Sequence, residues 1–151
     1  MDIDLILAIG HHLAVFLLVA ILAAEFALLR PGLAGARVGQ LARIDAAYGG
    51  MAMLVIVVGV LRVIFGASGW EYYVANYAFW AKMAAFLAVG LLSIQPTLAI
   101  RRWDSAGKGD AGYAVPHTEI AASRRFIHLQ AGMLVLIPIF AAAMARGYGV
   151  S

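Results

Sequence analysis

The chain has 151 residues, of which 64% are hydrophobic and 13% are charged, and its mean hydropathy is +0.92. This composition indicates an integral membrane protein with a single domain and excludes a water-soluble globular domain. The chain contains no cysteine, which excludes disulfides, thiolate catalysis and cysteine-ligated metal clusters. The net charge of +3 does not indicate a nucleic-acid partner, because the arginines fall in short stretches between apolar segments.

Four apolar segments follow one another along the chain, at about residues 5–29, 46–65, 74–100 and 120–145. Each reaches the ~20 residues that a helix needs to cross a hydrocarbon core of ~30 Å. The sequence therefore predicts an all-α integral membrane four-helix bundle made by residues 1–151. Because the N-terminus is acidic, we expect the first segment to be a retained span and not a signal peptide. The polar stretch from Asp104 to Thr118 is expected to be a loop.

Basic residues between the spans predict the orientation of the bundle. They gather in the first and third connections, whereas the second connection carries Glu71 and has Arg62 at its edge. We therefore expect an N-out, C-out protein of the bacterial inner membrane. The basic residues concerned are Arg30, Arg37 and Arg43 in the first connection and Arg101, Arg102, Lys108, Arg124 and Arg125 in the third.

A basic cluster is expected in the outer half of the bundle, with no acidic residue at its level. His11 and His12 lie roughly 10 Å below the outer end of the first span, counted at ~1.5 Å per residue, and Lys82 lies at a similar depth in the third. Ionisable groups inside a membrane are usually functional. A b-type haem would suit this cluster, because its iron needs nitrogen ligands and its propionates need cations or hydroxyl groups. The candidate haem-iron ligands are His11, His12 and Lys82, and the candidates for the propionate rim are Arg62, Tyr73 and Asn76.

The same cluster also has a purely structural explanation, in which no ligand is bound. The histidines can bond backbone carbonyls, while Lys82 and Arg62 extend their charged ends to the outer interface. His11 and His12 cannot both face one partner, because adjacent helix positions are about 100° apart. One of them is then free to meet a neighbouring helix or the second subunit of a homodimer.

A second polar level is expected near the inner face of the membrane. Glu25 on the first span, Asp45 at the start of the second and His128 on the fourth lie at matching depths. A carboxyl and an imidazole at this level suit proton transfer or the head group of a quinone. The alternative is a hydrogen-bonded pair that fixes the register of the helices.

Several motifs resemble a bacterial family of small four-helix predicted membrane proteins of unassigned function. The motifs are Gly10-His11-His12-Leu13-Ala14, Asp45-Ala46-Ala47-Tyr48-Gly49, Gly59-Val60-Leu61-Arg62, and Tyr72-Tyr73 followed by Asn76, Phe79-Trp80 and Lys82. More distantly, the early histidine and the early lysine of the third span resemble membrane protoporphyrinogen oxidases of the HemJ type. That resemblance implies a haem protein in which His11 or His12 and Lys82 matter. The first span lacks the tryptophan and proline–arginine pattern expected after that histidine, so the resemblance concerns the cofactor more than the reaction.

The sequence thus predicts a membrane protein that binds haem b and acts in electron transfer or oxidoreduction. The alternatives are a protein that handles haem or porphyrin, such as a HemJ-type oxidase, and a cofactor-free transporter or scaffold. The expected partners are the lipid bilayer, a quinone or a redox protein, and a second copy of the chain.

Overall fold

The computed structural model describes residues 2–149 and contains four long helices and one short helix. The long helices are α1 (Ile3–Leu28), α2 (Ala36–Phe65), α4 (Tyr77–Gly109) and α5 (His117–Ala145), and the short one is α3 (Gly69–Val74). All four long helices are long and apolar enough to cross a membrane. The predicted all-α four-helix membrane bundle is confirmed, and the protein is a multi-pass membrane protein.

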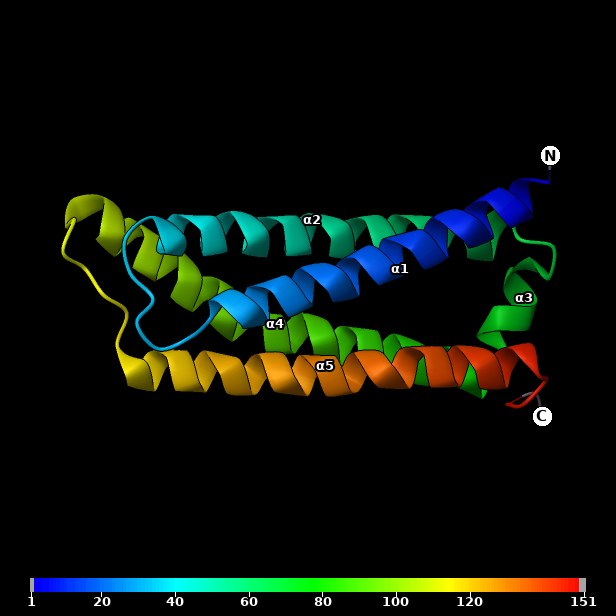
Figure 1. The fold of residues 1–151 in the computed structure, drawn as a ribbon. Coiled ribbons are helices and arrows are strands. Elements are labelled where there is room, and N and C mark those ends of the chain that lie inside the picture. Colours follow the sequence, from blue (N-terminus) through cyan, green and yellow to red (C-terminus); the bar gives the residue numbers. More distant parts are fainter. Residues whose placement is uncertain (1, 150–151) are drawn as a thin grey trace.

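The helices form two antiparallel hairpins, α1 with α2 and α4 with α5, as Figure 1 shows. The N- and C-termini and α3 lie at one end of the bundle, called the terminal end below. The α1–α2 and α4–α5 connections lie at the opposite end, called the connection end. Between the hairpins, α2 packs against α4 more extensively than α1 packs against α5.

The boundaries differ from the prediction at three places. The second helix begins at Ala36 and not near residue 46, because Val38 and Leu41 are buried while Arg37 and Arg43 stay exposed, which makes this segment amphipathic. Asp45 therefore lies well inside α2. The expected loop from Asp104 begins only after Gly109, since buried Trp103 and the Lys108–Asp104 pair at 3.1 Å support further helical turns. The short helix α3 was not predicted.

Side chains at the start of α4 fix the terminal end. Asn76 caps this helix by accepting a hydrogen bond from the Ala78 N–H at 2.8 Å. The Tyr72 hydroxyl of α3 donates to the Met144 carbonyl at 3.0 Å. The Tyr77 N–H donates to the Gly149 carbonyl at 2.9 Å. The last turn of α5 therefore holds α3, and the segment that follows α5 holds the first turn of α4.

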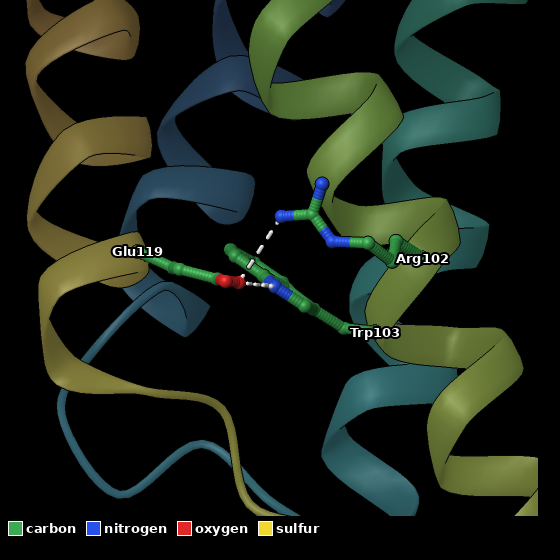
Figure 2. Close-up of polar contacts among 3 residues, drawn as sticks. All are labelled: Arg102, Trp103 and Glu119. Carbon is green, nitrogen blue, oxygen red and sulfur yellow. Dashed lines mark hydrogen bonds and ion pairs between the residues drawn. The ribbon is translucent and has the colours of Figure 1, made fainter.

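Polar contacts at the connection end lie both within the α4–α5 hairpin and between the two hairpins. The Trp103 indole N–H on α4 donates to the Glu119 carboxylate on α5 at 2.5 Å, and Arg102 reaches the same oxygen at 3.2 Å (Figure 2). The Arg124 guanidinium on α5 donates to the Leu29 carbonyl at 2.6 Å. The Val115 N–H also donates to the Leu33 carbonyl at 3.0 Å, beside an antiparallel bridge between Ala34 and Ala114.

We predict that Trp103→Phe lowers the free energy of unfolding by about 1.5–3 kcal/mol, because it removes the hydrogen bond from a buried indole to a charged carboxylate while keeping an aromatic ring. Arg102→Gln is the matched control, since its ion pair is largely exposed and should contribute at most about 1 kcal/mol. Unfolding in detergent, followed by circular dichroism, measures both values. Equal losses in the two variants would contradict the assigned role of Trp103.

The arginines of the connection end predict that this end faces the cytoplasm. An alkaline phosphatase fused after the C-terminus should be active, and a green fluorescent protein at the same place should stay dark. The reverse pattern would invert the orientation and place the terminal end in the cytoplasm.

Candidate functional site

An apolar cavity of about 240 Å³ lies among the four long helices, in the half of the bundle nearer the terminal end. His11 on α1 and Lys82 on α4 are the ionisable side chains among its lining residues, and no carboxylate of residues 2–149 lines it. The remaining wall is aliphatic or aromatic, for example Leu18, Phe86 and Leu134. The cavity thus presents two nitrogen groups to an otherwise apolar space.

The cavity opens sideways between α2 and α4. Val60 and Ile64 of α2 and Met83 of α4 all line it, yet they are 50%, 57% and 38% exposed. In a membrane bundle, exposed apolar side chains at this level meet lipid tails. A molecule dissolved in the bilayer can therefore reach the cavity without passing through water.

The His11 ring packs against α2 at Gly59. A Cβ atom added to Gly59 would lie 3.5 Å from His11 Cε1, so the missing side chain leaves the space that the imidazole occupies. The Nδ1 atom of His11 is buried and has no hydrogen-bond partner within residues 2–149. A buried nitrogen without a partner is available to a ligand. The role of Gly59 was not foreseen, although its position three residues before Arg62 was a usable signal.

Lys82 is half-buried, and its ammonium nitrogen lies 5.5 Å from the centre of the Phe79 ring. The same ring lies 5.7 Å from that of Tyr73. Arg62 lies within electrostatic range of both Lys82 and His11. The structure therefore brings His11, Lys82 and Arg62 to one level, although Arg62 does not line the cavity.

Three of the other predicted site residues lie outside the cavity. His12 is exposed on the outer surface, and its Nδ1 lies 2.7 Å from the Ala8 carbonyl of its own helix. Tyr73 is buried behind Phe79. Asn76 is fully buried at the cap of α4 and supports the helix that carries Lys82.

A buried polar cluster occupies the half of the bundle nearer the connection end. Glu25 of α1 and Asp45 and Tyr48 of α2 are only 2%, 6% and 4% exposed, and they lie within electrostatic range of one another. Thr97 of α4 donates to Asp45 at 2.8 Å. One oxygen of Glu25 and the Tyr48 hydroxyl have no partner within the described chain. Tyr48 was not predicted as part of this level, though it lies three residues after Asp45 on the same helix face.

Gln130 forms a hydrogen bond between α5 and α4 in this half of the bundle. Pro96 lacks an N–H, so the Leu92 carbonyl four residues earlier loses its helical partner. The side-chain amide of Gln130 on α5 donates to that carbonyl at 3.4 Å. A buried side chain thus supplies the donor that the proline removes, as membrane helices require.

His128 does not join Glu25. It is exposed on α5, and its ring lies edge-on to Phe26 at 4.6 Å. The neighbouring positions Glu25 and Phe26 point to different helices, so the glutamate faces α2 while the phenylalanine faces α5. The carboxyl group of Glu25 therefore lies within electrostatic range of Asp45 and Tyr48 and not beside an imidazole.

Comparison with known proteins identifies one family. No curated protein and no solved structure matches the chain. The model of a family described as predicted membrane protein (DUF2214) matches residues 3–149, which is nearly the whole chain and includes both the cavity and the buried polar cluster. This chain belongs to the DUF2214 family of predicted membrane proteins.

Proposed function

We propose that this membrane protein binds one b-type haem at the cavity near the terminal end and serves electron transfer or oxidoreduction in the bilayer. One observation carries the proposal. The side chains of His11 and Lys82 come from different helices to the same apolar cavity, and no carboxylate among the lining residues neutralises them. A ligand that combines a metal centre, acidic groups and a large apolar surface is complementary to two nitrogen groups in an apolar cavity.

The donor chemistry fits such a group. A neutral imidazole is a common axial ligand of haem iron, and the buried Nδ1 of His11 has no competing partner in the described chain. The cavity of about 240 Å³ is smaller than the ~300–1,000 Å³ of typical ligand pockets. The exposed side chains on the α2–α4 side leave room for a larger ring to extend toward the lipid or toward a second copy of the chain.

Each residue of this chain would then have a defined task. His11 would ligate the metal, and the α2 backbone at Gly59 would limit the rotation of its ring. Lys82 would act as a second nitrogen donor or as the partner of a propionate, and Arg62 would add positive charge at the same level. Bound haem would supply reversible one-electron chemistry, while the protein supplies its position and electrostatic surroundings.

The buried polar cluster suits proton movement coupled to such chemistry. Two buried carboxyl groups and a tyrosine hydroxyl within electrostatic range of one another are groups that can take up and release protons inside the bundle. The Tyr48 hydroxyl and Thr97 extend the cluster across α2 and α4. We therefore propose a quinone or a redox protein as the electron partner and the bacterial inner membrane as the location.

The same cluster favours a second candidate, a cofactor-free transporter driven by protons. That function would need Glu25 and Asp45 but no metal at His11. A visible spectrum of the purified protein separates the two candidates. A Soret band with reducible α and β bands supports haem, whereas a colourless preparation that stays unchanged after haemin addition favours the transporter.

We predict that His11→Ala abolishes the Soret band of protein purified from haem-producing cells. His12→Ala is the matched control, because His12 is exposed and bonds its own helix; it should keep the band. Absorbance per mole of protein measures both variants. Retention of a normal spectrum by His11→Ala would remove His11 as the iron ligand.

We predict that Lys82→Met changes the haem site without unfolding the protein, because methionine keeps the apolar stem and lacks the amine. If Lys82 supplies a nitrogen donor to the iron, its loss should alter the visible bands; if it pairs with a propionate, its loss should shift the midpoint potential instead. Lys108→Met, at the exposed far end of α4, controls for the removal of one positive charge. Unchanged spectrum, potential and haem content in Lys82→Met would exclude the lysine from the site.

A further inference from the structure

A basic depression of about 730 Å³ lies at the connection end, between the end of α1 and the first half of α5. Five of its lining side chains are basic or imidazole groups, and no acidic residue of the described chain lines it. They are Arg30, which follows α1, and His117, Arg124, Arg125 and His128 of α5. This site is separate from the cavity that contains His11, and the inference below does not depend on haem.

The Arg124 guanidinium is held in one position in the depression by contacts with the end of α1. It lies 4.0 Å from the centre of the Phe26 ring and donates to the carbonyls of Leu29 at 2.6 Å and Phe26 at 3.3 Å. Phe26 lies in the last turn of α1 and Leu29 is the residue that caps it, where carbonyls have no helical partners. The helix end therefore orients Arg124, and its charge cannot move away from the depression.

The other two arginines are free to meet a ligand. Arg30 and Arg125 are exposed and make no ion pair within residues 2–149. Glu119, the acidic residue of the first turn of α5, is turned toward α4, where Trp103 and Arg102 hold its carboxylate (Figure 2). The positive charge of the depression thus remains without a counter-charge from this helix.

An apolar surface continues from the depression along α5 toward the middle of the bundle. Leu129 lines the depression, and Leu136 lies seven residues later on nearly the same helix face. Both are exposed, at 49% and 37%. A ligand here meets cations at the membrane interface and apolar side chains below them.

We infer that this depression binds the phosphate of an anionic phospholipid, with the head group between Arg30 and Arg125 and an acyl chain along Leu129 and Leu136. Guanidinium groups bind phosphate oxygens through paired hydrogen bonds, and basic recesses between membrane helices on the cytoplasmic side favour anionic lipids. The orientation predicted from the loop arginines places this end on that side.

The test measures lipid binding by native mass spectrometry of the full chain released from neutral detergent. Phosphatidylglycerol is the probe, phosphatidylcholine is the neutral lipid, and inorganic phosphate tests for a free anion. The double variant Arg30→Gln/Arg125→Gln should bind phosphatidylglycerol about tenfold or more weakly. The matched control Arg37→Gln/Arg43→Gln removes two exposed arginines from the same end, outside the depression, and should change binding less than about twofold.

Four results would overturn the inference. Equal binding of both lipids would remove charge recognition, and equal losses in the two double variants would reduce it to a general surface effect. Displacement of phosphatidylglycerol by inorganic phosphate at matched concentration would assign the site to a free anion. A photoreactive phosphatidylglycerol on the unmodified protein gives a second measurement, with crosslinks expected at residues 121–129; crosslinks only elsewhere would also overturn it.

Discussion

The need to satisfy polar groups inside an apolar solvent controls this bundle more than any single contact. Lipid offers no hydrogen bonds, so each donor and acceptor inside the spans must find its partner within the protein. The clearest case is Pro96, whose missing N–H leaves the Leu92 carbonyl to the amide of Gln130. Arg124 likewise donates to the Leu29 carbonyl, which has no helical partner at the end of α1. These polar contacts decide which faces of α1, α4 and α5 meet.

The same constraint makes the exceptions informative. Eight buried side-chain atoms have no partner in the described chain, although most buried polar atoms have one. The nitrogen atoms belong to His11, Arg62 and Asn76, and the oxygen atoms belong to Glu25, Tyr48, Gln95, Ser123 and Gln130. They fall into two groups at different depths, the nitrogen atoms at the level of the apolar cavity and the oxygen atoms nearer the connection end. The terminal half of the bundle therefore offers nitrogen atoms to a ligand, and the connection half offers oxygen atoms suited to protons.

The number of spans, the helical class and the common level of His11, Lys82 and Arg62 followed from the sequence, because residue counts convert to depth in a membrane. Rotation about the helix axis did not follow from those counts. Glu25 and His128 have matching depths, yet they face different neighbours. Similarly, nothing in the chain order of His11 and His12 indicated that Gly59 would receive the first ring. The helical turns at 36–45 and 104–109 were missed because they lie outside the apolar runs, where amphipathic packing and Trp103 stabilise them.

Because the cavity opens sideways between α2 and α4, the ligand concentration that governs binding is the concentration in the bilayer and not in water. A ligand that enters from the bilayer is counted per lipid molecule and not per volume of water, because it first partitions into the hydrocarbon. A strongly apolar ligand can therefore saturate the cavity while its concentration in water remains very low. The same opening means that detergent molecules compete directly for Val60, Ile64 and Met83, so the apparent affinity of the protein depends on the amphiphile that surrounds it.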